Sequence, residues 1–250
     1  MKKSFLFLAA IFISIYAALA QTESATEIIK MADEKLRGFC NESSTTMKII
    51  RPTWQREVKF KGWGRGYDYN LTLIEAPAKE KGQSFLKRKK EMWSWNPAIA
   101  RMIKLPPSMM SQGWMGSDYT NEDILKESSI VNDYNHKILG SDSVNGMDCY
   151  IIELIPKPNV AVIWGSMHKW VSKSGYLQMK TEFFDEDKVL IRTDHSYDVK
   201  TMDDREIPTR TEIIPADKEG YKTIIIVESI KYRVEIKEDY FSQQNLKNFK

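Results

Sequence analysis

Residues 136–156 read HKILGSDSVNGMDCYIIELIP, and this stretch contains the local pattern that decides the fold. Two apolar-rich runs, HKILG and CYIIELIP, flank the dipeptide Asn145-Gly146. Both residues of such a dipeptide adopt a positive φ easily, so it favours a tight turn between two strands. The stretch therefore predicts a β-hairpin.

The same kind of pattern recurs along most of the chain from Thr45 onward. Short runs with a period of two, rich in β-branched and aromatic residues, are bounded by Gly, Pro, Asn or Asp, which is typical of strands. These runs are MKIIR, REVKFKGW, YNLTLIEA, SFLKRK, ARMIKL, HKILG, CYIIELIP, HKWVS, LQMKTEFF, VLIRTD, PTRTEII and KTIIIVESIKYRVEI. A dozen sequential strands with few helices predict an antiparallel meander that curls to bury one face.

One amphipathic helix is expected before the first strand. Ser24 and Glu27 have the spacing of a capping box, apolar residues recur after them at helical spacing, and Gly38 follows as an end signal. No fixed-period repeat or linker divides the chain. We therefore expect one domain over residues 21–250.

The first 20 residues have the composition of a secretory signal peptide. Lysines at positions 2 and 3 precede the apolar run Phe5–Leu19, and small residues at positions 18 and 20 suit a cut before Gln21. The run is shorter than the roughly 20 residues of a spanning helix, which disfavours the alternative of an uncleaved anchor. These features predict an exported chain that keeps no membrane anchor after cleavage.

Charge and cysteine content exclude several classes of function. The predicted signal peptide carries two lysines and no acid, so its removal lowers the net charge from +3 to +1, which argues against a nucleic-acid partner. The basic run 87–90, KRKK, is interpreted as a solvated strand face or edge rather than a patch for anionic lipid. Cys40 and Cys149 are expected to be separate thiols rather than a bridge, and their spacing does not suit a metal. We expect no cofactor and no metal.

Residues 106–127 interrupt the strand pattern. Two prolines and several turn residues exclude a central strand, and Thr120 with Asp123 can cap a short helix through Leu125. We call this segment the flap. Its apolar members Met109, Met110, Trp114 and Met115 must pack on something, either as ordinary core or as an adaptable cover of an apolar cavity, because methionine repacks around irregular partners.

Several motifs give the sequence a resemblance to a known family. The block Glu91–Pro97, EMWSWNP, resembles a strand of the periplasmic lipoprotein carrier LolA. The longer pattern is closer to the LolA-like branch of outer membrane lipoprotein-sorting proteins. Its marks are Lys81-Gly82, Met92-Trp93, Trp114–Asp118 (WMGSD), Glu122–Ile124, Asp133-Tyr134, Cys149-Tyr150, Pro156-Lys157, Phe241 and Leu246.

The resemblance implies a mainly β fold, an unclosed antiparallel half-barrel with an amino-terminal helix and a short helical lid over an apolar cavity. It implies a soluble, monomeric carrier in the periplasm of a Gram-negative-type bacterium, which receives acylated cargo from an inner-membrane transporter and passes it to an outer-membrane acceptor. Each acyl methylene removed from water is worth about 0.8 kcal/mol, so such cargo needs a shield. The predicted lipid contacts are Trp93, Trp95, Met102, Met109, Met110, Trp114 and Met115; Met92 is left out because it opposes the two strand tryptophans.

One element of the family pattern is missing. The carriers hold the lid with an Arg directly before a Pro on an inner strand, and the matching stretch Gly66–Pro77 has no such Arg. Arg51-Pro52 is the right dipeptide but lies one strand too early, and Arg65 lacks the proline, so the latching role is assigned to neither.

A catalytic constellation is not recognisable. Ser166 and His168 stand near each other, but the second Gly of a nucleophile elbow is absent, and the acidic run around Asp185 is interpreted as a solvated hairpin tip. We expect the chain not to be an enzyme. The hypotheses are a lipid carrier, a lipid-binding accessory module of an envelope transporter and, less favoured, a lipid hydrolase that uses the same cavity.

Overall fold

The computed structural model describes residues 23–121, 123, 130–160 and 162–248. The predicted signal peptide of residues 1–20 lies outside them. Within the described residues, no helix combines the length and the apolar composition that crossing a membrane requires.

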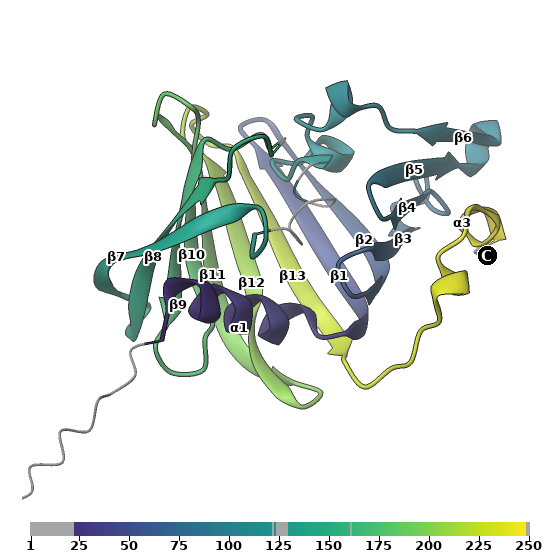
Figure 1. The fold of residues 1–250 in the computed structure, drawn as a ribbon. Helices are drawn as coiled ribbons and strands as arrows, with labels where there is room; N and C mark the ends of the chain where they lie inside the picture. Colours follow the sequence, from purple (N-terminus) through teal and green to yellow (C-terminus); the bar gives the residue numbers. More distant parts are fainter. Residues whose placement is uncertain (1–22, 122, 124–129, 161, 249–250) are drawn as a thin grey trace, which may run out of the picture.

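A single antiparallel sheet of 13 strands forms the body of the molecule (Figure 1). The strands are β1 (Cys40–Arg51), β2 (Trp54–Arg65), β3 (Tyr69–Ala76), β4 (Ser84–Arg88), β5 (Glu91–Asn96), β6 (Arg101–Lys104), β7 (Tyr134–Val144), β8 (Met147–Pro156), β9 (Ser166–Ser172), β10 (Gln178–Phe184), β11 (Leu190–Met202), β12 (Arg205–Pro215) and β13 (Lys222–Lys231). This confirms the predicted antiparallel meander.

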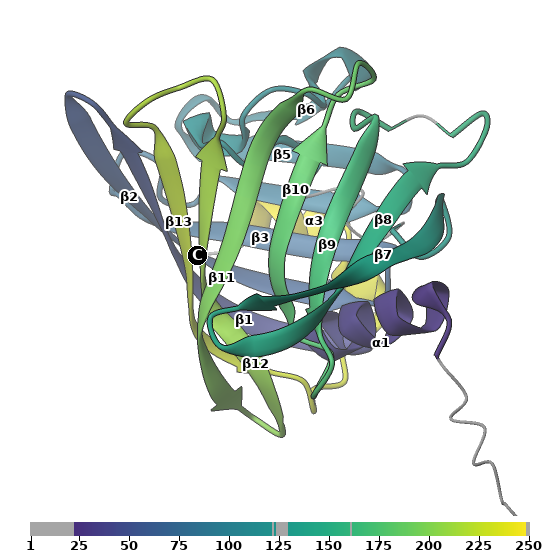
Figure 2. The ribbon, with the colours of Figure 1, turned by 90° about the vertical axis from the view of Figure 1, so that its left-hand side faces the viewer.

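The order of strands is β6-β5-β4-β3-β2-β1-β13-β12-β11-β10-β9-β8-β7. Neighbouring strands in the sheet are consecutive in sequence, except for β1 and β13, whose pairing joins the two halves. The strands β6 and β7 are the two edges and do not pair with each other, so the sheet is not closed. Figure 2 shows that the sheet curls, so that β3, β5 and β6 stand behind β9 and β10. We call β1–β6 the first arm and β7–β13 the second arm.

The quoted hairpin forms as predicted. Asn145 and Gly146 have φ values of 52° and 78°, and Val144 pairs with Met147 across the turn between β7 and β8. The last predicted run continues to Ile236, but β13 ends at Lys231. The side chain of Asp203 accepts hydrogen bonds from the backbone N–H of Tyr232 and of Arg233, which draws the chain out of the ladder.

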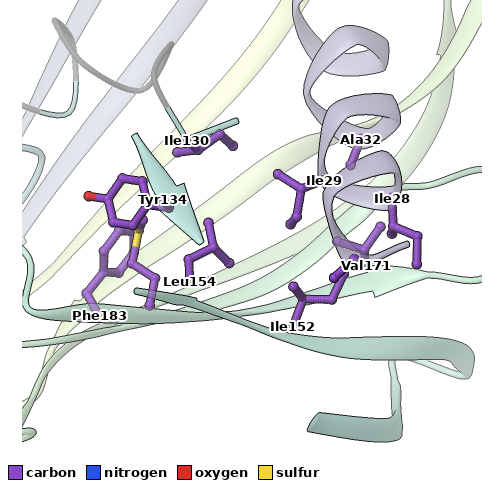
Figure 3. Packing of buried hydrophobic residues seen from close by; sticks show 11 residues of the cluster. Ile28, Ile29, Ala32, Ile130, Tyr134, Ile152, Leu154, Val171 and Phe183 are labelled. Atoms are coloured by element: carbon purple, nitrogen blue, oxygen red, sulfur yellow. The ribbon is translucent and has the colours of Figure 1, made fainter. Parts of the chain in front are cut away.

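The predicted helix is α1 (Ala25–Arg37), with Ser24 and Glu27 forming both halves of the capping box and Gly38 at φ 64°. It lies across the lower part of the second arm (Figure 1). Figure 3 shows its apolar face against the sheet, in a buried cluster that includes Ile28, Ile29, Ala32, Ile152, Leu154, Val171 and Phe183. This cluster fills the space between α1 and the second arm.

The carboxyl-terminal segment, residues 232–248, covers part of the outer face of the first arm. It includes η5 (Glu238–Tyr240) and α3 (Gln243–Asn248). Phe241 and Leu246 are fully buried in a cluster with Leu71 and Leu86. The outer face of β3 and β4 around these residues is therefore a second core, whereas Lys48 and Glu57 on the outer side of β1 and β2 are exposed.

The flap links the two edge strands. It contains η2 (Pro107–Met109) and η3 (Trp114–Gly116), and an isolated bridge joins Gly113 to Thr120. The predicted cap is confirmed: Thr120 N–H donates to Asp123 Oδ2 at 2.8 Å, and Asp123 N–H donates to Thr120 Oγ1 at 3.1 Å. The end of the predicted helix at Leu125 lies outside the described residues.

The short helix η1 (Pro97–Ile99) connects β5 with β6. The two cysteines are separate buried thiols, which confirms that prediction. Burial raises the pKa of the Cys149 thiol, so Cys149 is a weakly reactive core residue.

Candidate functional site

A cavity of about 390 Å³ lies on the concave side of the sheet. Its walls come from β1–β4 of the first arm and from β9–β13 of the second arm, while α1 and the flap residue Trp114 also contribute to the lining. This volume is in the range of small-molecule sites, roughly 300–1,000 Å³. The interior is therefore not filled by the protein's own side chains.

Trp114 anchors the apolar part of the site. Its side chain is 2% exposed and packs with Met47, Ile49 and Met92. Its ring meets Phe60 and Phe85 edge to face, with centroids 5.2 and 5.4 Å apart. The indole N–H finds no acceptor among the described residues. The flap thus packs one large aromatic side chain onto the inner face of the first arm.

Arg51 and Arg56 hold the tip of the flap. Arg51 Nη1 lies 2.9 Å from Asp118 Oδ2, both side chains are only 8% exposed, and Arg51 Nη2 donates to the Gly116 carbonyl at 3.0 Å. Arg56 Nη2 donates to the Met115 carbonyl at 2.8 Å. The sequence assigned Arg51 no latching role because it lies one strand early. The structure nevertheless places it against the flap, since the end of β1 reaches the same rim of the sheet.

Arg192 holds the other end of the flap from β11. It bonds to Asp123 at 2.6 Å and to Asp194 at 2.9 Å, and its guanidinium lies over the ring of Phe183 at 4.0 Å. Burial opposes the charge, but the carboxylates of Asp194 and Asp123 outweigh it and raise the pKa of Arg192. Sequence reasoning missed this residue; the available signal was a lone arginine at an inward position of the run VLIRTD.

The cavity wall is mainly apolar but also contains polar residues. Asn41, Ser43 and Thr45 face it from β1, and Gly62 and Gly64 face it from β2. A Cβ atom on Gly64 would lie 2.7 Å from Asn41 Nδ2, so glycine is needed for the Asn41 side chain to lie over β2. Polar groups and bare backbone therefore form part of the first arm's inner wall.

Lys87 also faces the cavity, which corrects the interpretation of the run 87–90 as a solvated face. Its side chain is buried and Nζ donates to the Tyr67 carbonyl at 2.6 Å, whereas residues 88–90 are exposed. Arg88 alternates to the other face and is the last residue of β4, and Lys89 and Lys90 lie in the turn that follows. On the second arm Lys169 is buried in the same cavity and donates to Gln178 Oε1 at 2.9 Å.

Of the seven predicted lipid contacts, Trp114 alone lines the cavity among the described residues. Met110 and Met115 pack against the same cluster as Trp114. Met109 is half-buried, and its carbonyl accepts a hydrogen bond from Asn121 Nδ2 at 2.8 Å. Met110 and Met115 therefore pack beside Trp114, and none of the three flap methionines lines the cavity.

Trp93, Trp95 and Met102 lie on the opposite face, and the expectation that they face the cavity is corrected. They pack with Phe241 and Leu246 under the carboxyl-terminal segment. Met92, which the sequence reasoning left out, is the residue of β5 that points toward Trp114. The alternation of β5 is as predicted, but the face predicted to line the cavity is the outer one. The apolar residues of the carboxyl-terminal segment also need a partner, and Trp93 and Trp95 provide it.

The Ser166–His168 pair lies on β9 away from the cavity. Met167 and Lys169, which alternate with these two residues, line the cavity instead. His168 Nε2 lies 3.7 Å from Glu153 Oε1, and its ring packs against Phe184 with centroids 4.8 Å apart. A hydrolase that uses this pair on a ligand in the cavity is incompatible with that geometry.

Three solved structures share the fold. A DUF1329 family protein from Desulfovibrio piger has a TM-score of 0.81 at 23% identity, covering 89% of this chain and 97% of that chain. An outer membrane lipoprotein-sorting protein domain from Vibrio parahaemolyticus has a TM-score of 0.79 at 20% identity, covering 89% and 98%. A LolA superfamily protein from Nitrosomonas europaea has a TM-score of 0.77 at 22% identity, covering 89% and 99%.

No curated protein matches the chain in sequence. A family model described as that of an uncharacterized protein matches residues 66–248, most of the chain. The chain therefore belongs to this family, and its fold is the LolA-like fold of the outer membrane lipoprotein-sorting proteins, which confirms the resemblance seen in the sequence.

Proposed function

We propose that this protein is a soluble periplasmic carrier that shields the acyl chains of lipoproteins or related lipids in its cavity during transfer toward the outer membrane. The observation that carries the proposal is the cavity of about 390 Å³ beside the flap, which is held by separate contacts with Arg51, Arg56 and Arg192. The fold shared with a lipoprotein-sorting domain supports the same function.

The energetics of such a carrier are sufficient for reversible binding. Transferring about ten methylenes from water into the cavity would gain on the order of 8 kcal/mol, before the cost of ordering the ligand. A free energy of that size corresponds to a dissociation constant of about 1 μM. Cargo would be held during transit and released when an acceptor offers a larger apolar surface.

The flap supplies a means of access. Three arginines hold it through individual hydrogen bonds and ion pairs, and its tip is not part of the 13-stranded sheet. Breaking these contacts would free the flap and withdraw Trp114 while leaving the strand ladders intact. A carrier needs such a cover, because cargo must enter and leave without unfolding the sheet.

Quenching of tryptophan fluorescence by brominated acyl chains tests whether acyl chains enter the cavity, because bromine quenches an indole that it touches. A chain in the cavity should quench Trp114 and Trp164, which both line it, so Trp114→Phe should remove part of the quenching. Trp54→Phe is the matched control, since Trp54 is 50% exposed at the end of β1–β2 and away from the cavity. Equal quenching in the two variants would contradict the proposal.

Transfer distinguishes a carrier from an accessory module. Protein loaded with a fluorescent acyl probe should release it stoichiometrically to acceptor vesicles, and mass spectrometry of the protein purified from its own periplasm should detect bound lipid or lipopeptide. An accessory module would retain its ligand when vesicles are added. Conversion of the probe into a hydrolysed product would instead indicate an enzyme.

A further inference from the structure

Hydroxyl side chains line the cavity from both arms. They include Ser43, Thr45 and Thr72 of the first arm and Ser196 and Thr211 of the second arm. The Thr72 hydroxyl donates to Asn70 Oδ1 at 3.0 Å, whereas the hydroxyls of the other four form no hydrogen bond with the described residues. Because an unpaired buried hydroxyl is costly, these groups must pair with whatever fills the cavity.

Thr45 is the most informative of these residues. Its side chain is 8% exposed, and its partner across the pairing of β1 with β13 is Val227, which also lines the cavity. Valine has the same branched shape as threonine without the hydroxyl, so the packing alone does not require threonine here. Thr211 has the same relation to Ile225 on β13. A cavity built only for acyl chains would gain from an apolar β-branched residue at both positions.

The inner wall of the first arm changes from polar to apolar in rows across β1, β2 and β3. Strand pairing gives the rows, which are Asn41 with Gly64 and Asn70, then Ser43 with Gly62 and Thr72, then Thr45 with Phe60 and Ile74. In the first two rows β2 contributes only glycine, so the polar part of the wall has no bulky side chain on that strand. The third row reaches Trp114 through the edge-to-face contact of Phe60.

The amide of Asn41 indicates which kind of group the polar rows accept. Its Nδ2 donates to the Arg37 carbonyl at 3.1 Å, while its Oδ1 receives no hydrogen bond from the described residues. An ester carbonyl or a carboxylate offers only acceptors, so neither can donate to Oδ1. A hydroxyl both donates and accepts, and it therefore matches this oxygen as well as the hydroxyl side chains.

We propose that the cavity takes an amphiphile whose headgroup carries several hydroxyl groups, as glycerol or a sugar does, joined to an acyl chain. The headgroup lies along the polar rows between Asn41 and Thr45, and Thr211 contributes a hydroxyl from the second arm. The acyl chain lies toward Phe60 and Trp114. This inference rests on the proposed carrier function and adds the chemical class of its cargo.

Isothermal titration of the wild-type protein tests the headgroup with probes of equal chain length. The probes are monodecanoylglycerol, decyl glucoside, methyl decanoate and decyl phosphate, together with free glycerol and glucose. Methyl decanoate keeps the chain and the ester of monodecanoylglycerol but has no hydroxyl, and it is the more apolar of the two, so transfer from water alone would favour it.

The hydroxylated amphiphiles should bind best. We expect monodecanoylglycerol and decyl glucoside to bind at least about 10-fold more tightly than methyl decanoate or decyl phosphate, as one or two added hydrogen bonds imply. Both should bind at least about 100-fold more tightly than free glycerol or glucose, which lack the acyl chain. Tighter binding of one hydroxylated amphiphile than of the other would identify glycerol or sugar as the source of the hydroxyls.

A matched pair of double variants tests the residues. Thr45→Val with Thr211→Val keeps the shape of both side chains and removes their hydroxyls. It should reduce the preference for monodecanoylglycerol over methyl decanoate to less than about 3-fold and leave the affinity for methyl decanoate within about 3-fold of wild type. The control, Thr46→Val with Thr193→Val, removes two hydroxyls that do not line the cavity and should keep the preference. If the first double variant does not fold, each single substitution should remove part of the preference.

Each contrary outcome overturns a distinct statement. Binding of methyl decanoate as tight as that of both hydroxylated amphiphiles would refute the hydroxylated headgroup and leave the carrier function standing, and equally tight binding of decyl phosphate would do the same. An unchanged preference in the Thr45 and Thr211 variant, or an equal loss in the control, would refute the headgroup site. Free glycerol or glucose binding as tightly as the amphiphiles would refute an amphiphile, and failure of every acyl or alkyl probe to bind would refute the proposed function itself.

Discussion

Replacing Asp118 with Asn should release the flap without unfolding the sheet. The Asp118 carboxylate accepts hydrogen bonds from Arg51 Nη1 at 2.9 Å and from Thr223 Oγ1 at 2.7 Å, and both ionic side chains are nearly buried. Asn retains the shape but removes the charge, so a charge-assisted bond worth about 1.5–3 kcal/mol becomes a neutral one and Arg51 loses its counter-ion.

The loss should appear as local opening. We expect the flap amides of Trp114 and Asn121, which donate to the Tyr119 and Gln112 carbonyls, to exchange with solvent roughly 10- to 100-fold faster in Asp118→Asn, as a change of about 1.5–3 kcal/mol implies. Amides in the centre of the sheet, such as those of β1 and β13, should keep their protection. Hydrogen exchange followed by mass spectrometry measures both sets in one experiment.

Glu57→Gln is the matched control, because it also removes one carboxylate from an ion pair. Glu57 lies 3.9 Å from Lys48, and both side chains are more than 40% exposed, so the expected effect is below about 1 kcal/mol. If flap exchange in Asp118→Asn equals that of the control, Arg51 does not latch the flap. If flap and sheet amides exchange faster by the same factor, the flap is not a separately opening unit.

Three further predictions follow from buried contacts. Arg192→Met should lower the free energy of unfolding by about 3–5 kcal/mol in urea titrations, because it leaves the buried carboxylates of Asp123 and Asp194 without their cation. Arg233→Met, which removes a side chain that is 70% exposed in its ion pair, should cost less than about 1 kcal/mol. Burial lowers the pKa of His136 below 6.5, so the contribution of the neutral imidazole to the free energy of unfolding is complete above that pH and is lost as the pH falls. His136→Gln should therefore flatten this part of the plot of unfolding free energy against pH. Met92→Ala should destabilise the sheet by about 2–5 kcal/mol in the same titrations, because the side chain is 2% exposed against the Trp114 cluster.

Features that depend on residues close in sequence could be predicted. The capping box of Ser24 and Glu27, the Asn145-Gly146 turn and the pair of Thr120 with Asp123 all act within four residues, and each is present. Most strands were predicted because alternation is a local property of the chain. The resemblance to LolA-like proteins gave the unclosed sheet, which the strand patterns alone did not determine.

Features that depend on pairing between distant residues were not predictable. The contact between Arg51 and Asp118 joins residues 67 positions apart, and the lining positions of Lys87 and Lys169 depend on which face of each strand turns inward. The alternation with a period of two shows which residues of β5 share a face, but it does not tell which of the two faces lies toward the cavity. Trp93 and Trp95 were assigned to the wrong side because the carboxyl-terminal segment competes with the cavity for apolar partners.

The pairing of β1 with β13 has a consequence for how the chain folds. Within each arm all strand pairs are neighbours in sequence, so each arm can assemble from short-range contacts as soon as its own residues are available. The seam between the arms aligns Glu42 with Lys231, and closing so long a loop carries an entropic cost that local pairs avoid. The strand pairs within each arm can therefore form early, whereas the ladder that unites the arms must wait until β13 has been synthesised.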